Sequence, residues 1–173
     1  METDQGINKS QGEMKGTVLV KSGIGDLEKK ITFKTTIVHR FDDQGLGLEV
    51  AGLNEAPLAL ISLRFKKDRQ HSDNFTFPSS DIQSLAFVDG EFYPRYPAQQ
   101  GEVMFENHDG AGELRVNGRL NFVTQKGAGG RYCEVDVVFS VTGITKPLTT
   151  LDGTEKRLIE SLRAEASQPN KLG

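Results

Sequence analysis

The clearest pattern in the chain is a one-by-one alternation of apolar and polar residues in its second half. Between 114 and 122 the apolar residues fall on even positions, whereas between 132 and 142 they fall mainly on odd positions. Because successive side chains of a strand point to opposite faces, each stretch predicts a strand with one buried face. Residues 125–130 include three glycines, which suit a tight turn, so the two strands should form an antiparallel hairpin.

The sequence suggests a register for the predicted hairpin. It also predicts a third strand beside it. If Leu120 lies opposite Val135, then Arg119 lies opposite Asp136 on the solvent-facing side. A glycine-containing turn joins the hairpin to an earlier alternating strand at 102–106. The resulting three-stranded meander has one apolar side, and this side must be covered by the rest of the chain.

The first half of the chain predicts further strands separated by turn residues. Alternation or short apolar runs indicate strands at 14–22, 29–40, 46–50, 58–65 and 82–88. Most of the 19 glycines stand between such runs and therefore mark turns. About eight or nine strands with one terminal helix predict an all-β fold, either an antiparallel β-sandwich or a partly closed barrel.

The character of the chain changes after residue 150. Asp152 and Glu155 have the spacing of a capping box that begins a helix. The apolar residues that follow recur at helical spacing, namely Leu158, Ile159, Leu162 and Ala166. A helix of this length is marginal alone in water, so we expect its apolar stripe to dock on the sheet or on another molecule.

These patterns divide the chain into four parts. Residues 1–13 are polar and aperiodic and are expected to form a flexible N-terminal arm, whereas residues 14–150 form a single β domain. Residues 151–166 form the C-terminal helix, and residues 167–173 form a polar tail. A chain of 173 residues is long enough for one domain with a core of its own.

Composition and charge narrow the choice of partners. The chain is 36% hydrophobic and 26% charged, which is ordinary for a globular protein, and its net charge of -3 offers no basic field to nucleic acid. No apolar run approaches the roughly 20 residues of a membrane span. Residues 1–14 lack the apolar segment of a signal peptide, which favours a cytoplasmic protein, although removal of such a peptide would leave the same sequence.

The residue types that perform catalysis or bind metals are not grouped in the sequence. Histidines occur singly at His39, His71 and His108, and no Gly-x-Ser-x-Gly motif is present. Cys133 lies on the apolar face of its predicted strand, where a lone cysteine is expected to be an inert core residue. We therefore expect a protein that is not an enzyme and that needs no cofactor and no metal.

A proline-containing aromatic loop has the composition of a contact surface. Tyrosine and arginine are enriched at protein-binding hot spots because they combine a large contact area with polar ends. The candidate contact residues are four from this loop and two from the terminal helix, namely Phe92, Tyr93, Arg95, Tyr96, Leu158 and Leu162. The alternative is that Phe92 and one tyrosine fold back and plug one end of the sandwich.

Two functions are consistent with these features. The first is a non-enzymatic β-sandwich that binds another protein or assembles with copies of itself. The alternative is a barrel-like protein that binds a small apolar ligand in an internal cavity. An interior filled by side chains favours the first function, whereas an enclosed cavity of several hundred cubic ångströms, roughly the size of known ligand sites, favours the second.

The scattered ligand residues generate a prediction about metals. Because no cluster of histidine, cysteine or carboxylate side chains is specified, dialysis against a chelator should leave the melting temperature of the protein unchanged. Differential scanning fluorimetry before and after dialysis would measure this. A loss of several degrees that one divalent ion restores would mean that separated ligands converge in the fold.

Overall fold

The computed structural model describes residues 10–43, 47–66, 71–90, 95–108 and 114–145. These residues form ten strands and one short 3-10 helix. The elements in chain order are β1 (Gln11–Lys21), β2 (Leu27–Thr35), β3 (Val38–Asp43), β4 (Gly47–Glu55), β5 (Leu58–Phe65), β6 (Asp73–Phe77), β7 (Ile82–Asp89), β8 (Arg95–His108), β9 (Arg115–Thr124), η1 (Ala128–Gly130) and β10 (Tyr132–Thr142). The helix predicted over 151–166 lies outside the described residues.

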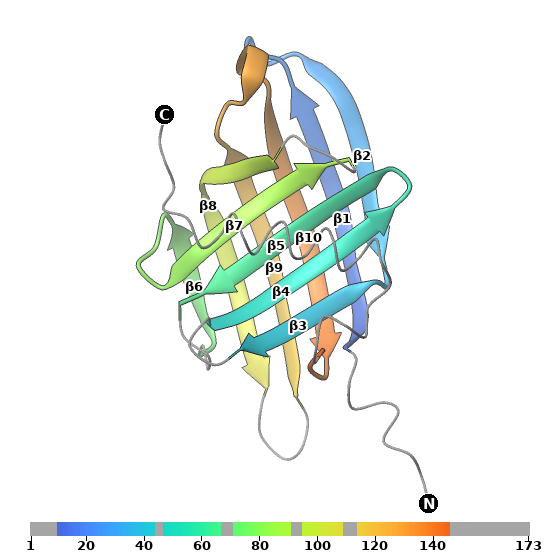
Figure 1. The fold of residues 1–173 in the computed structure, drawn as a ribbon. Coiled ribbons are helices and arrows are strands. Elements are labelled where there is room, and N and C mark those ends of the chain that lie inside the picture. The colour runs from blue at the N-terminus through green and yellow to red at the C-terminus, as the bar shows by residue number, and fades with distance from the viewer. Residues whose placement is uncertain (1–9, 44–46, 67–70, 91–94, 109–113, 146–173) are drawn as a thin grey trace, which may run out of the picture.

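The ten strands form one antiparallel sheet that folds over on itself (Figure 1). The strand order is β2-β1-β10-β9-β8-β7-β5-β4-β3, and β6 pairs with β8 beside this path. Layer A consists of β2, β1, β10, β9, β6 and most of β8. Layer B consists of β3, β4, β5 and β7 and packs across layer A (Figure 1). The sheet is nearly closed and barrel-like, which confirms the all-β prediction.

Strand β8 belongs to both layers. Its first residues, Arg95 to Pro97, pair with β7, and the remainder pairs with β9. The β8–β9 ladder shifts register between Ala98 and Gln100, which leaves Gln99 as an extra residue at the corner between the layers. The sequence predicts this strand only from 102 onward, because the aromatic and proline residues before it suggest a loop. β8 accommodates Pro97 because this residue lies beside the bulge.

Side chains from the two inner faces fill the space between the layers. Five phenylalanines on different strands are at most 1% exposed, namely Phe33, Phe65, Phe87, Phe105 and Phe122. The ring centroids of Phe65 and Phe105 lie 4.7 Å apart. A β-carbon added at Gly52 would lie 2.7 Å from the sulfur of Met14, so the layers also touch closely at that point. This packing supplies the main apolar burial of the domain.

The hairpin predicted between 114 and 142 is confirmed as β9 and β10, but its register differs from the expected one. Leu120 lies opposite Val137 rather than Val135. A shift of two residues keeps every side chain on its face, so alternation alone cannot distinguish the two registers. Arg119 still reaches Asp136, diagonally, with its Nε and Nη2 at 2.9 and 2.8 Å from the two carboxylate oxygens.

The strand predicted over 29–40 is in fact two strands. β2 ends at Thr35 and β3 begins at Val38, and the chain passes from layer A to layer B between them. The hydroxyl of Thr35 donates to the carbonyl of Leu53 and accepts from the amide of Ile37, which satisfies backbone groups at this corner. The unbroken run of threonine and isoleucine gives no sign of the corner.

The outer edge of β3 is bonded to the ends of β1 and β10 through a buried cluster, which we call the seam (Ser10, His39, Arg40 and Thr145). The amide of Arg40 donates to Ser10 Oγ at 2.9 Å, and its carbonyl accepts from the amide of Thr145 at 2.8 Å. Thr145 Oγ1 lies 2.8 Å from both Ser10 Oγ and His39 Nδ1. The sequence assigns 10–13 to the flexible arm, but Ser10 is buried and β1 begins at Gln11.

Substitutions on the buried and the exposed face of the meander should differ in their effect on stability. Phe139→Ala or Leu120→Ala should lower the free energy of unfolding by about 2–5 kcal/mol, because both side chains are buried and leave cavities. Arg119→Ala should have a much smaller effect, because its ion pair with Asp136 is half exposed. Urea titration of the three variants would measure this, and equal losses would contradict the assignment of faces.

Candidate functional site

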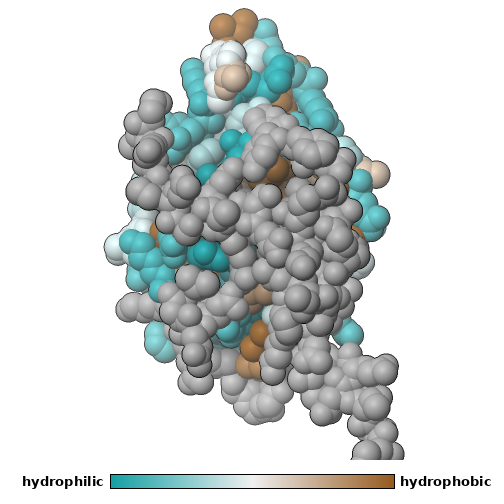
Figure 2. All heavy atoms as spheres, in the orientation of Figure 1, coloured by the Kyte–Doolittle hydropathy of each residue, from teal (hydrophilic) through white to brown (hydrophobic). Residues whose placement is uncertain are grey.

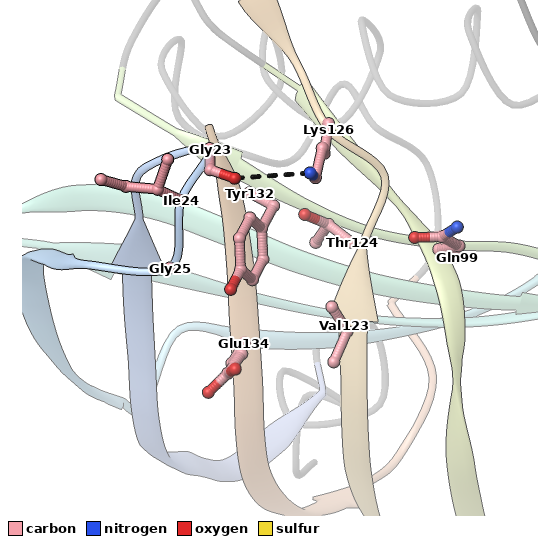
Figure 3. Close-up of a pocket in the computed structure, with 9 residues that line it drawn as sticks. All are labelled: Gly23, Ile24, Gly25, Gln99, Val123, Thr124, Lys126, Tyr132 and Glu134. Carbon is pink, nitrogen blue, oxygen red and sulfur yellow. Dashed lines mark hydrogen bonds between the residues drawn. The ribbon is translucent and has the colours of Figure 1, made fainter. Parts of the chain in front are cut away.

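A surface depression lies at the end of layer A where β1 turns into β2, and we call it the turn-end site. Its volume is about 420 Å3. It is lined by Gly23, Ile24, Gly25, Gln99, Val123, Thr124, Lys126, Tyr132 and Glu134 (Figure 3). The β1–β2 turn forms one side, the bulge of β8 forms the opposite side, and β9 and β10 form the floor (Figure 3).

The β1–β2 turn is held by hydrogen bonds of its own. The amide of Ser22 donates to the carbonyl of Asp26 at 2.8 Å, and the amide of Gly25 donates to the carbonyl of Ser22 at 2.9 Å. The hydroxyl of Ser22 also accepts from the amide of Asp26 at 3.1 Å. Gly25 has a φ of +93°, a conformation that favours glycine. The turn therefore has a defined shape.

This ordered turn displays large aliphatic side chains to solvent. Ile24 is 87% exposed at its tip, and Leu27, the first residue of β2, is 57% exposed. Figure 2 shows a hydrophobic tip at this end of the molecule. Single exposed aliphatic residues are common on protein surfaces, but Ile24 also lines the depression, which makes it the candidate contact residue of this site.

Three polar side chains of the turn-end site form bonds to neighbouring elements. Lys126 Nζ donates to the carbonyl of Gly23 at 3.4 Å, which links the β9–β10 connection to the β1–β2 turn (Figure 3). Glu134 forms an ion pair with Lys21 at 3.1 Å. The hydroxyl of Thr124 accepts from the amide of Cys133 at 2.8 Å. This arrangement suits binding by a fixed surface.

The candidate contact residues of the aromatic loop differ in how far they are buried. Tyr96 is 2% exposed and its ring stacks on Phe87 with a centroid distance of 6.4 Å. It is therefore a core residue rather than an exposed contact, as in the plug alternative. Arg95 is partly buried, and its Nη2 donates to Ser84 Oγ at 3.3 Å. Phe92, Tyr93, Leu158 and Leu162 lie outside the described residues, and their contact role stays a prediction.

Cys133 and Tyr96 lie beneath the turn-end site as buried titratable groups. The thiol of Cys133 is fully buried, which confirms its predicted place in the core. Burial raises the pKa of this thiol from 9.0 to about 12, and the Asp89 carboxylate adds to the shift. Burial also raises the pKa of Tyr96 above 10.0. At neutral pH both groups are therefore uncharged.

Sequence reasoning did not select Ile24 as a functional residue. The Gly23-Ile24-Gly25 segment predicts a hairpin turn, and this prediction is confirmed. The available signal was an aliphatic residue at the centre of a glycine turn, where no inner face exists to bury it. The other lining residues come from β8, β9 and β10, and only the fold brings them together.

Two further features of the described part of the chain concern metal ligands and membrane spans. No group of three or more histidine, cysteine or acidic residues is arranged to hold a metal ion among the residues that the structure describes. Within the same residues, no helix is long and apolar enough to cross a membrane. Comparison of the chain with protein-family models, curated proteins and solved structures found no match.

The raised thiol pKa predicts how stability changes in alkaline solution. Between pH 9.0 and about 12 the unfolded thiol loses its proton while the folded thiol of Cys133 keeps it. The free energy of unfolding should therefore be unaffected by this thiol below pH 9.0 and should fall as pH rises through this window. In urea titrations at about pH 8 and about pH 10.5, Cys133→Ala should show a smaller loss than the parent chain. Equal losses would mean that the thiol ionises alike in both states.

Proposed function

We propose that the chain is a non-enzymatic β-barrel-like binding protein that uses the turn-end site to contact another protein or a second copy of itself. The observation that carries this proposal is the exposure of Ile24, at 87%, on a hydrogen-bonded turn beside a depression of about 420 Å3. Tyr132 and Lys126 extend the surface with an aromatic ring and a charged group. A patch of this composition resembles the apolar centre and polar rim of protein interfaces.

The energetic argument concerns what a partner would gain. Burying one isoleucine or leucine side chain is worth roughly 1.5–3 kcal/mol, so Ile24 and Leu27 together offer a substantial part of a weak to moderate affinity. The turn is already ordered by the Ser22 bonds, so little conformational entropy is lost when it binds. A preordered apolar tip is therefore an efficient contact residue.

Ion pairs beside the turn support a specific rather than a general apolar contact. Arg131 Nε lies 2.6 Å from Glu28, and Lys21 Nζ lies 3.1 Å from Glu134. Charges at the margin of an apolar patch contribute little affinity, but they select the orientation of a partner and reject mismatched surfaces. The turn-end site thus combines an apolar anchor with polar groups that give selectivity.

The alternative function, binding of a small apolar ligand inside the barrel, has less support. The inner faces contribute phenylalanine rings that pack on one another, such as Phe65 against both Phe75 and Phe105. Close contact between Met14 and Gly52 brings the layers together. An interior occupied in this way favours a function carried by the outer surface.

Substitution of the apolar tip tests the proposed function. Ile24→Asp should leave the melting temperature within about a degree of the parent chain, because a mostly exposed side chain contributes little to the fold. It should also reduce binding at least tenfold, because a charge replaces the anchor. Binding would be measured by sedimentation velocity for self-association and by capture of a partner identified through a photo-crosslinker at Leu27.

The matched control is Val138→Asp. Val138 is another aliphatic residue exposed on layer A, at 42%, but it lies in the middle of β10 away from the turn. This variant should bind like the parent chain. Loss of binding in Val138→Asp with normal binding in Ile24→Asp would move the interface to the middle of the sheet and contradict the proposal.

A further inference from the structure

The outward face of layer B is buried, although it is the side away from layer A. The strand pairing defines three central rows on this face, of which one crosses β4, β5 and β7 and two cross all four strands. The side chains on these rows are Leu53, Leu60 and Val88, then His39, Ala51, Ser62 and Ala86, then Phe41, Glu49, Arg64 and Ser84. Each of them is at most 6% exposed.

No described element covers this face. Figure 1 shows β3, β4, β5 and β7 with layer A behind them and no described strand or helix in front. Burial along β4 and β5 is continuous, whereas in β10 buried residues alternate with more exposed ones. A strand buried on both faces has a layer on each side, so a further part of the chain must lie over layer B.

The described chain ends beside this face. The amide of Thr145 donates to the carbonyl of Arg40 on β3, the edge strand of layer B, at 2.8 Å. Residues 146–173 continue from this point. The N-terminal arm also joins the fold at the seam, but residues 1–9 contain only Met1 and Ile7 as large apolar side chains. The C-terminal segment is therefore the better match for an apolar face.

The dimensions of the C-terminal segment fit the face. A helix over 154–166 would be about 20 Å long. Four strands about 4.8 Å apart span about 14 Å between the axes of the outer two, so such a helix reaches across layer B. The residues between Thr145 and Thr154 can extend over about 25 Å, which is enough to bring the helix into place.

We propose that the segment 151–166, with its helix over 154–166 after the cap at Asp152, docks its apolar stripe on the outward face of layer B of the same chain. Leu158, Ile159, Leu162 and Ala166 then meet the cluster of Phe41, Leu53, Leu60 and Val88. The ion pair between Glu49 and Arg64 compensates two charges that lie under this cover. This assignment concerns a different face from the turn-end site and does not depend on the proposed function.

A thiol placed under the cover tests the proposal. Ser62→Cys changes one atom at the centre of the face, on a side chain that is 5% exposed. In the full chain this thiol should react slowly with a maleimide under native conditions. Leu162→Asp in the same chain should raise the rate at least tenfold, because a charge on the stripe weakens docking. Ala164→Asp, on the opposite side of the predicted helix, should leave the rate unchanged.

The buried thiol of Cys133 serves as an internal control for unfolding. If Leu162→Asp unfolds the domain, both thiols become reactive, and Ala166→Asp then replaces it as a milder change on the stripe. Fast labelling in the parent chain would overturn the proposal. Protection that neither stripe variant removes would also overturn it, because another segment would then be the cover.

Cross-linking distinguishes docking within one chain from docking on a second copy. A chain carrying Ser62→Cys and Leu162→Cys should be joined by a short bismaleimide into a product of monomer mass. A product of dimer mass would show that the helix docks on a neighbouring copy, and it would contradict docking in the same chain. Absence of any cross-linked product would contradict the placement of the helix over layer B.

Discussion

The structure depends on bonding one free edge of a long sheet. An open sheet leaves a row of unpaired amide and carbonyl groups on each outermost strand, here β2 and β3. At β3 the amide and carbonyl of Arg40 are taken up by Ser10 and Thr145, which lie next to the ends of β1 and β10. These bonds tie the edge of layer B to layer A, and burial of the apolar core between the two layers supplies the main driving force for the arrangement.

The two layers differ in how their outer faces are used. Layer A alternates buried and exposed residues, so its outer face meets solvent and carries the turn-end site at one end. Layer B is buried on both faces and carries an ion pair between Glu49 and Arg64 within its outer face. The proposed contact with a partner therefore falls on the exposed layer, and the proposed docking of the helix falls on the doubly buried layer.

The strands of layer A, which have one exposed face, were easier to predict from the sequence than those of layer B, which are buried on both faces. β9 and β10 could be predicted because each has one buried face and one solvent-exposed face. Apolar residues such as Leu120 mark the first face, and polar residues such as Arg119 mark the second. In β5 both faces are buried, and its apolar run could not show which residues face the core. The corner after Thr35 and the register of Leu120 depend on contacts between distant strands. We assigned Ile24 to the candidate site because its side chain is exposed in the structure. The alternation of apolar and polar residues does not reveal the exposure of a residue in a turn.

The seam also determines how the domain would respond to mechanical load. Ser10 and Thr145 are hydrogen-bonded to each other, and they adjoin the paired ends of β1 and β10. A force applied through the two ends would therefore act on this one point and would open the β1–β10 ladder one pair at a time, like a zipper. Lys21 and Tyr132, beside the turn-end site, form the last pair of that ladder. The turn-end site, where we propose that a partner binds, would be the part of this strand pair that tension reaches last.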